Sequence, residues 1–367
     1  MLSFIKKVII KLYLYIVGMM PSKYIFWESQ PIHSDNAFAV YKYIKDNNLL
    51  SQYEHIWYDS EMYQKKPFLY RYYLARSKAV IFCNNLFSKA RKNQLTVNLC
   101  HGSKTKKTRG KYEAPKDLDY ILVQADVFKE AMTYEYNLSD HTKMITLGYP
   151  RNDDLLNKSD ITAQCLFKRD FKKLIIWYPT FRQHKNGSNY SSVTIPIVHN
   201  DILSKKLNEC AKKNDVLIVL KPHFAQDVSF IKKSKLSNIM IINDDFLVEN
   251  KIRSYQMLSM SDALLTDYSS IYYDYLLVDK PIGMVWEDYD EYKKNQGFAL
   301  DPDMIYQGGE KIFNIDDFCD FVERIAQGKD ILQKERNKIK DITNVYKDNQ
   351  SSKRVGDFIV NKINGCE

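Results

Sequence analysis

The stretch LLTDYSSIYYDYLL (264–277) begins as an apolar strand, gathers hydroxyls and a carboxylate in its middle, and returns to an aromatic, apolar helix. A strand that runs directly into a helix is the repeating step of a parallel sheet with helices on its faces. Polar residues at such a junction lie at the carboxyl end of the strand, where these sheets bind ligands. The junction therefore predicts an α/β fold and either a helix cap or an anion site. The residues concerned are Thr266, Asp267, Ser269 and Ser270.

The alternation of strand and helix continues on both sides of this stretch. Strands are predicted at YIFWES (24–29), AVIFCNN (79–85), LTVNLCHG (95–102), KLIIWYPTFR (173–182) and DVLIVLKPH (215–223). Helical segments such as NAFAVYKYIKDNN (36–48) lie between them. This alternation indicates parallel sheets that are covered by helices on both faces.

A polar, charged stretch at residues 153–172 separates the predicted strands into two series. With 367 residues, the chain is long enough for two domains that each have a hydrophobic core. We therefore expect two doubly wound domains, at residues 21–155 and 170–328, that face each other across a cleft. The helical residues 329–367 are expected to cross back to the first domain.

The composition indicates a folded protein with an anionic partner. Apolar residues make up 45% of the chain and charged residues 27%, which excludes the disordered class. The formal charge of +9 suits a nucleic acid, a membrane surface or a phosphorylated substrate. Nucleic acid is disfavoured, because the positive charges do not form one stripe interleaved with aromatic residues. The six cysteines form no CxxC pair and no His/Cys cluster, as in a reduced, cytoplasmic protein.

The first 20 residues, MLSFIKKVIIKLYLYIVGMM, carry the clearest membrane signal. Lys6, Lys7 and Lys11 interrupt the apolar residues, so the uncharged run that follows is too short to span a bilayer. As a helix, the segment has a wide apolar face with a basic edge, which suits the surface of an anionic membrane. The alternative is a helix packed on the protein's own core. We expect peripheral attachment to the cytoplasmic face of the cell membrane.

The segment LCHGSKTKK (99–107) places a histidine and several cations at the end of a predicted strand. The residues that could contact a ligand are His101, Gly102, Ser103 and Lys106. Histidine suits a general base beside a phosphate, because its ordinary pKa allows proton transfer near neutrality. The alternative is a solvated basic loop. Cys100 precedes His101, but neighbours in an extended chain point to opposite faces, which argues against a Cys–His nucleophile pair.

Two strands of the second series end in a similar way. YPTFR (178–182) contains Thr180 and Arg182, and an arginine can pair bidentately with a phosphate. VLKPH (219–223) contains Lys221 and His223. For His223, the alternative is a histidine at the edge of the core, bonded to the backbone. Together with the 264–277 junction, these strand ends predict a cleft that holds a diphosphate.

Other ligand classes leave no signature in the sequence. The GxGxxG and GxxxxGK[ST] motifs are absent, which argues against dinucleotide and P-loop ATP sites. The D-x-D strings at 288–290 and 301–303 lie among charged residues and are interpreted as solvated. Because no metal-ligand cluster is visible, we expect that no cofactor is required. Mg²⁺ would only assist, and the sequence does not indicate it.

Six motifs occur in the order HGSKTK, LGYPRND, YPTFR, LKPH, LLTDYSSIYYDYL and DYDEYKKNQGF. Over roughly residues 70–310, the sequence thereby resembles the CDP-glycerol glycerophosphotransferases of teichoic acid and capsule synthesis. The resemblance implies a GT-B-like fold of two domains and a peripheral membrane enzyme. It also implies transfer of glycerol phosphate from CDP-glycerol to a hydroxyl of a lipid-linked saccharide or polymer, with release of CMP.

The family's motifs fall on strand-end residues. Its HGT motif corresponds to residues 101–103, and its Thr-Asp-Tyr-Ser-Ser motif corresponds to residues 266–270. By resemblance, His101 is the candidate base, and Arg182 and His223 hold the diphosphate together with the two serines. The predicted catalytic residues are His101 and His223. The predicted substrate-binding residues are Gly102, Ser103, Lys106, Thr180, Arg182, Lys221, Thr266, Asp267, Ser269 and Ser270.

The sequence departs from the family pattern at three places. Lys104 stands where the family usually has Pro, and Gln296 stands where Arg is usual. Gln307-Gly308-Gly309 replaces a Pro-Gly-Pro stretch. The last two departures bear on the alditol and the acceptor more than on the chemistry.

Three other functions stay open at this point. CDP-ribitol could replace CDP-glycerol as donor. A GT-B glycosyltransferase would bind the diphosphate of a nucleotide sugar at the same strand ends. A non-catalytic module that binds anionic polymers is disfavoured, because it would have no need of the two histidines.

Overall fold

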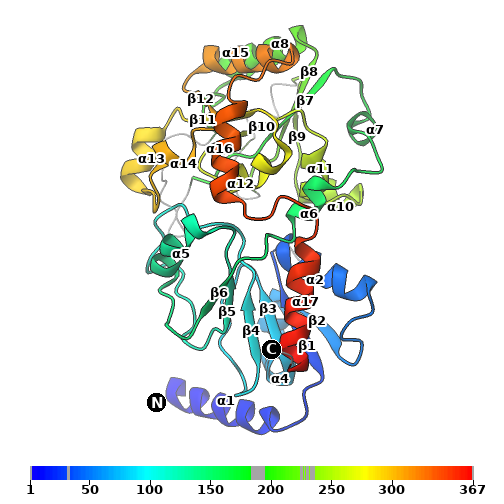
Figure 1. Ribbon diagram of the computed structural model, residues 1–367, viewed down its shortest axis with the longest axis vertical. Helices are drawn as coiled ribbons and strands as arrows, with labels where there is room; N and C mark the ends of the chain where they lie inside the picture. Colours follow the sequence, from blue (N-terminus) through cyan, green and yellow to red (C-terminus); the bar gives the residue numbers. More distant parts are fainter. Residues whose placement is uncertain are drawn as a thin grey trace. The chain divides into compact units, whose positions relative to one another are not determined.

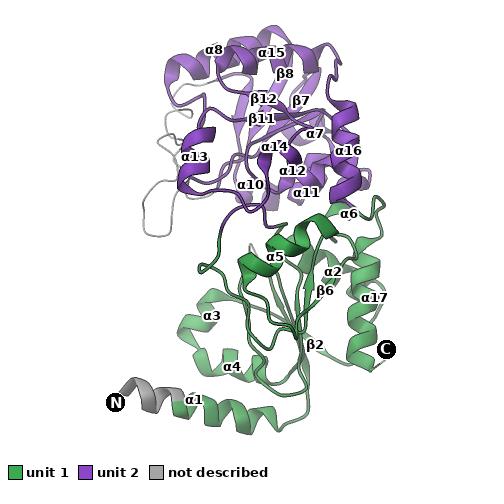
Figure 2. Ribbon diagram, turned by 60° about the vertical axis from the view of Figure 1, so that its left-hand side comes forward, with its two compact units in different colours: residues 1–103, 108–153, 345–367 green, residues 104–107, 154–344 purple. Residues whose placement is uncertain are grey.

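The computed structural model describes residues 2–30, 34–182, 195–223, 226, 228, 231 and 236–365, with side chains from residue 8 onward. The chain divides into two compact units, drawn in green and purple in Figure 2. Unit 1 comprises Met1–Ser103, Thr108–Asp153 and Val345–Glu367, and unit 2 comprises Lys104–Lys107 and Asp154–Asn344.

Unit 1 is built on a six-stranded parallel sheet with the strand order β2-β1-β3-β4-β5-β6 (Figure 1). The strands are β1 (Tyr24–Glu28), β2 (Glu54–Trp57), β3 (Ser77–Phe82), β4 (Leu95–Asn98), β5 (Tyr120–Leu122) and β6 (Lys143–Ile145). Every residue of β1 is buried, as is expected where helices cover both faces of a parallel sheet.

The helices of unit 1 come from both ends of the chain. They are α1 (Leu2–Gly18), α2 (Asp35–Asp46), α3 (Ser60–Lys65), α4 (Pro67–Ala75), η1 (Asp126–Phe128), α5 (Lys129–Tyr136) and α17 (Ser351–Asn364). The C-terminal helix α17, red in Figure 1, packs against α2. Tyr43 on α2 donates a hydrogen bond of 2.8 Å to Asp357 on α17. The last helix therefore belongs to the same core as the first strands.

Helix α1 is apolar on two opposite faces. Its inner face packs on α4, where Val17 is buried and the Tyr13 hydroxyl donates to the carbonyl of Phe68 (3.0 Å). On its outer face, Leu12 and Tyr15 are 58% and 69% exposed. Packing on the protein's own core thus accounts for only one of the two faces. Among the residues that the structure describes, no helix is both long and apolar enough to cross a membrane.

Unit 2 repeats the architecture with a second six-stranded parallel sheet, in the order β12-β11-β10-β7-β8-β9. The strands are β7 (Lys173–Trp177), β8 (Val216–Leu220), β9 (Ile239–Ile241), β10 (Ala263–Thr266), β11 (Ile282–Val285) and β12 (Glu310–Ile312). The helices are α7 (Ala163–Phe167), α8 (Asp201–Lys213), α10 (Asp244–Glu249), α11 (Ser254–Ser259), α12 (Ile271–Tyr275), η2 (Leu276–Val278), α13 (Tyr289–Asn295), α14 (Pro302–Ile305), α15 (Ile315–Ala326) and α16 (Gln333–Thr343). The short α6 (Asn152–Leu156) spans the boundary between the units.

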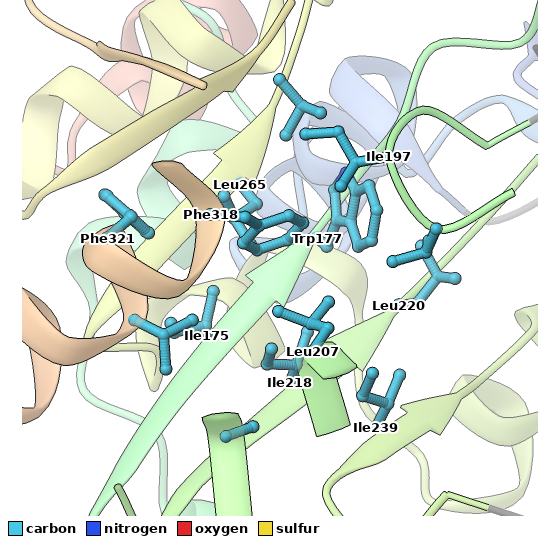
Figure 3. Close-up of a cluster of buried hydrophobic side chains, with 14 of the residues drawn as sticks. Ile175, Trp177, Ile197, Leu207, Ile218, Leu220, Ile239, Leu265, Phe318 and Phe321 are labelled. Atoms are coloured by element: carbon cyan, nitrogen blue, oxygen red, sulfur yellow. The ribbon is translucent and has the colours of Figure 1, made fainter. Parts of the chain in front are cut away.

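The core of unit 2 lies between the sheet and the paired helices α8 and α15 (Figure 3). Trp177 from the central strand β7 meets the ring of Phe318 from α15 edge-on, with centroids 5.2 Å apart. The side chains of Ile218 and Leu265 complete this layer from the two neighbouring strands. This packing fixes the ends of β7, β8 and β10, which carry the polar residues.

The division of the chain differs from the predicted domain limits in three places. Unit 2 begins at Asp154 rather than at residue 170, because Asp154 pairs with Arg253 before α11 (2.5 Å). Residues 329–344 also belong to unit 2, where buried Arg336 of α16 donates to Asp330 (2.8 Å). The return to unit 1 starts at Val345. The third difference is that residues 104–107 belong to unit 2, although the chain on both sides belongs to unit 1.

Candidate active site

In unit 1, a sharp backbone turn presents His101 at the carboxyl end of β4. Cys100 adopts the left-handed conformation (φ 56°), and its N–H donates to the side chain of Asn98 (2.8 Å). Gly102 follows with φ 151°, a conformation that favours glycine. As a result Cys100 is fully buried, whereas the imidazole of His101 is 65% exposed. The separation of the two side chains agrees with the prediction that they form no nucleophile pair.

The exposed imidazole has a buried partner that sequence analysis missed. The Nδ1 atom of His101 is hydrogen-bonded to Oδ2 of Asp35, whose side chain is only 4% exposed. Arg151 donates from Nη1 to Oδ1 of Asp35 (2.8 Å) and to the carbonyl oxygen of His101 (2.7 Å). His101, Asp35 and Arg151 therefore form one connected group within unit 1.

Asp35 stays ionised in this group. Burial alone would raise the pKa of Asp35, but the charges of Arg151 and His101 outweigh burial and hold the pKa well below its ordinary value. Because an ionised carboxylate only accepts hydrogen bonds, the shared proton lies on Nδ1 of His101.

Ser103 is engaged inside unit 1. Its hydroxyl donates to Oε1 of Gln124 (2.9 Å) and lies 3.3 Å from the hydroxyl of Tyr149. Its side chain is buried, and its contacts join the chain after His101 to the segments that follow β5 and β6. Contact of Ser103 or Gly102 with a substrate stays a prediction.

In unit 2, Arg182 forms the centre of a buried charge cluster. Its side chain is 2% exposed and pairs with Asp267 (2.8 Å) and with Asp288 (2.7 Å). The hydroxyl of Tyr268 donates to the same Asp288 carboxylate (2.9 Å). Burial lowers the pKa of Arg182, but the two carboxylates more than offset this effect and raise it above its ordinary value. Arg182 is thus bound tightly by the protein itself.

The interpretation of Asp288 as a solvated residue is wrong. Asp288 is buried because it neutralises Arg182, whereas Asp290, Asp301 and Asp303 in the same strings are exposed. A string of alternating acidic residues gives no indication of which member faces inward.

Asp267 and Thr266 connect the ends of β7 and β10. Asp267 accepts hydrogen bonds from the backbone N–H of Thr180 (2.9 Å) and from the Thr180 hydroxyl (2.5 Å). The Thr266 hydroxyl donates to the carbonyl oxygen of Tyr178 (3.0 Å). Both Asp267 and Thr266 are fully buried, so these bonds shape the strand ends. Their predicted contacts with a substrate stay predictions.

Lys106 joins this cluster through the segment 104–107. The segment is bound within unit 2, since Thr105 accepts from the N–H of Ala299 (2.8 Å) and Lys106 forms an isolated β-bridge with Phe298. The Lys106 ammonium lies 3.4 Å from the Thr180 hydroxyl. Burial lowers the pKa of Lys106 to about 8, with the nearby Arg182 adding to the effect and Asp267 opposing it. An anion that binds beside Lys106 would therefore favour the protonated, charged form of this side chain.

Ser269 and Ser270 are the predicted residues with the least internal bonding. Both are partly exposed, and the Ser269 hydroxyl accepts only a long bond from the N–H of Ile271 (3.5 Å). Ser270 precedes α12 without a side-chain capping bond. Because α12 has only five residues, its dipole is small, and the hydroxyls are the stronger attraction for an anion. Tyr272, Tyr273 and Tyr275 are buried.

His223 and Lys221 follow β8. The exposed imidazole of His223 stacks on the ring of Phe181, with centroids 4.4 Å apart and planes inclined by 25°. Lys221 pairs with Asp244 at the start of α10 (2.7 Å). The stacking ring sets the plane of His223, and the ion pair holds Lys221 against α10.

The structure brings only part of the predicted residues into connected groups. His101 lies in unit 1, and Lys106, Thr180, Arg182 and Asp267 form the connected cluster in unit 2. Sequence analysis missed Asp35, Arg151, Tyr268, Phe181 and Asp288 as parts of these groups. Arg151, Tyr268 and Phe181 lie inside the quoted motifs, but Asp35 is the first residue of α2, directly after the N-cap, and belongs to no quoted motif. Within the described residues, no group of three or more His, Cys, Asp or Glu side chains could hold a metal ion.

The chain matches a sequence model of the CDP-glycerol:poly(glycerophosphate) glycerophosphotransferases over residues 13–361. A teichoic acid poly(glycerol phosphate) polymerase from Bacillus spizizenii is 24% identical over 338 residues, which cover 78% of this chain and 80% of the polymerase. A teichoic acid ribitol-phosphate primase from the same organism is 25% identical over 253 residues, which cover 66% of this chain and 59% of the primase.

A solved structure of the wall teichoic acid polymerase TagF is similar to the whole chain. The match has a TM-score of 0.73 and covers 99% of this chain and 97% of that chain, at 18% sequence identity. At that identity the likeness establishes the fold. The predicted GT-B-like class, with two parallel-sheet α/β domains, is confirmed.

The buried cluster around Arg182 sets an expectation for stability. Replacing Arg182 by Leu leaves Asp267 and Asp288 buried without a countercharge, which should lower the free energy of unfolding by roughly 3–5 kcal/mol. The comparison is Arg169→Leu, which removes a single bond to the carbonyl of Ser237 and should cost about 1 kcal/mol or less. Calorimetric melting of both variants tests this, and equal melting temperatures would show that Arg182 is not a structural ion.

Proposed function

The chain belongs to the family of CDP-glycerol:poly(glycerophosphate) glycerophosphotransferases, and from this premise we propose that it transfers glycerol phosphate from CDP-glycerol to a hydroxyl acceptor, with release of CMP. The acceptor is a saccharide or polymer carried on a membrane lipid. The product belongs to a teichoic acid or a related capsular polymer.

The observation that supports this proposal most directly is the chemistry at the carboxyl ends of the two sheets. Unit 1 presents an exposed imidazole with a fixed partner, which suits the removal of a proton. Unit 2 presents Lys106, the hydroxyls of Ser269 and Ser270, and the imidazole of His223, which suit the binding of a diphosphate. A group-transfer reaction of a nucleotide diphosphate needs both kinds of group.

In the proposed reaction, His101 accepts the proton of the acceptor hydroxyl. The oxygen attacks the phosphorus that bears glycerol, and the bond between this phosphorus and the oxygen of CMP breaks. CMP leaves with the electron pair of that bond. Lys106, His223 and the two serines stabilise the charge on the phosphate oxygens, while Arg182 holds the strand ends that carry them.

The outer face of α1 supports a peripheral position on the cytoplasmic face of the membrane. The outer face is apolar and exposed, whereas the inner face of the same helix packs on α4. A helix of this kind binds the interface between headgroups and acyl chains. Membrane contact would bring the enzyme to an acceptor carried on a lipid.

The activity is tested with a panel of donors and detection of the released nucleotide. We expect CMP from CDP-glycerol in the presence of a lipid-linked saccharide acceptor, and no UDP or GDP from nucleotide sugars. His101→Ala should slow CMP release by about 10²–10⁴-fold if the imidazole is the base. The matched control is His141→Ala, which removes an exposed imidazole of the same unit that pairs with Asp119.

Two results would overturn the proposal. Nucleotide release from a sugar donor alone would indicate a glycosyltransferase, and no release from any donor would indicate a binding module. CDP-ribitol belongs in the panel, because one relative of the chain is a ribitol-phosphate primase.

The low pKa of Lys106 predicts uptake of protons when the donor's diphosphate binds. At about pH 8.5 much of the free Lys106 is neutral, and a neighbouring dianion favours the ammonium form, so binding should take up roughly half a proton or more. CDP serves as a non-reacting probe, and calorimetry in two buffers of different ionisation enthalpy measures the uptake.

Lys106→Gln should abolish this proton uptake, and the neighbouring Lys107→Gln should retain it. Binding heats of the wild type that do not depend on the buffer would refute the role of Lys106. Equal uptake by the Lys106→Gln protein would do the same.

Membrane binding is tested by charging the outer face of α1. Ile9, Leu12 and Ile16 are 52%, 58% and 56% exposed, so replacing all three by Glu should leave the fold intact. Binding to vesicles of equimolar phosphatidylglycerol and phosphatidylcholine should weaken by about tenfold or more, because apolar burial is lost and the added charges repel the lipid. The control variant carries Glu at the exposed Ile202 and Val248 of unit 2. Equal vesicle binding by all three proteins would exclude α1 as the membrane contact.

A further inference from the structure

We propose that Asp35 and Arg151 are positioning residues of the transferase reaction, which hold His101 with its Nε2 atom as the basic atom. The inference rests on the proposed function, in which His101 is the base. It adds that the tautomer and direction of the imidazole are set by a carboxylate from α2 and a guanidinium from the loop after β6.

The two carboxylate oxygens of Asp35 bind different partners. Oδ2 is bonded to Nδ1 of His101, and Oδ1 accepts from Nη1 of Arg151 (2.8 Å) and from the N–H of Asn36 (2.9 Å). Both oxygens are thereby fixed, and the carboxylate has little freedom to rotate away from the imidazole. Since Nδ1 points to the buried carboxylate, Nε2 lies on the opposite side of an exposed ring.

Arg151 fixes the backbone of His101 as well as the carboxylate. The same Nη1 that binds Asp35 also donates to the carbonyl oxygen of His101 (2.7 Å). Its side chain is 7% exposed, so its charge is poorly screened by water. A lysine would keep the charge at this place but would lose the planar donor geometry.

Asn36 ties the neighbouring backbone segments to the group. Its Nδ2 donates to the carbonyl oxygens of Leu99 (3.0 Å) and Cys100 (2.9 Å), and its Oδ1 accepts from the N–H of Arg151 (3.1 Å). One side chain therefore joins the start of α2, the turn before His101 and the loop after β6. These bonds leave the three segments little room to move apart.

The backbone on both sides of the Asp35–His101 bond is held in a costly conformation. Asp35 and Cys100 both lie in the left-handed region, with φ of 62° and 56°. For residues other than glycine this costs about 1 kcal/mol or more each, and it persists where the surroundings enforce it. The N-cap residue Ser34 has an extended backbone (φ −131°), so capping of α2 does not account for the left-handed conformation of Asp35.

The charges around Asp35 keep it ionised. It faces Arg151 and His101, and the buried thiol of Cys83 lies close to it. Burial and then Asp35 and Glu28 raise the pKa of Cys83, so this thiol stays neutral and adds no charge. The carboxylate can therefore stabilise the imidazolium that forms when Nε2 takes the proton of the acceptor hydroxyl. The proton leaves to solvent after CMP has departed.

The test measures kcat and KM for CDP-glycerol with Asp35→Asn, Arg151→Lys and the control Asp126→Asn. Asp126 is 82% exposed and pairs only with Lys129 at the surface of the same unit. In Asp35→Asn, the amide N–H₂ can donate to Nδ1, which moves the imidazole proton to Nε2 and removes its basic lone pair. We expect kcat to fall by about 10²–10⁴-fold with little change in KM, and a smaller fall in Arg151→Lys.

The split between kcat and KM separates positioning from a general loss of structure. A distorted enzyme would also lose affinity for CDP-glycerol, whereas a misdirected imidazole slows the chemical step alone. A folded Asp35→Asn enzyme with wild-type kcat would overturn the proposal.

The tautomer of His101 in the wild-type protein gives a result that does not depend on the folding of any variant. Nitrogen NMR of the full chain labelled at histidine should show neutral His101 with its proton on Nδ1, and a proton on Nε2 would overturn the proposal.

The activity of the His101→Ala variant shows which proposed role is wrong, that of His101 as the base or that of Asp35. If that variant keeps its activity, the proposed base is wrong. If it is inactive while Asp35→Asn is fully active, only the role of Asp35 is wrong.

Discussion

The burial of Arg182 between Asp267 and Asp288 is the constraint on which the candidate site in unit 2 depends. A guanidinium with 2% exposure needs its countercharges close by, and they come from the ends of two different strands. Asp267 in turn binds Thr180, which lies beside Lys106, and Asp288 binds the hydroxyl of Tyr268. One neutralised charge thus sets the loops after β7, β10 and β11. Ser269, Ser270 and His223, predicted ligand groups that are partly or fully exposed, lie in the segments after β10 and β8.

Much of the fold was predictable, because parallel strands buried on both faces appear as continuous apolar runs. YIFWES became β1 and DVLIVLKPH became β8, with the polar residues at the expected ends. The limits of the two units were less predictable. They depend on single buried pairs, such as Asp154 with Arg253, whose members are about one hundred residues apart in the chain. Local composition carries no information about such pairs.

In the candidate site, too, contacts between residues far apart in the sequence could not be predicted. His101, Lys106 and the serines are predicted as site residues because each belongs to a short motif at a strand end. Asp35 was missed because it lies 66 residues before its partner, at the start of a helix where an aspartate is ordinary. Asp288 was interpreted as solvated because its sequence neighbours are charged, and its burial follows from a contact 106 residues away. Sequence motifs therefore identified the groups that face outward better than the groups that hold them.

Residues 104–107 belong to unit 2, although the chain on both sides belongs to unit 1, so the two units are not separate stretches of the sequence. A truncation that keeps only residues 154–344 retains the whole second sheet but loses Lys106 and the bridge to Phe298. In a chimera joined to a relative at residue 154, this lysine would come from one parent and its Thr180 partner from the other. Exchange of unit 2 between relatives therefore has to include the tetrapeptide that follows Ser103.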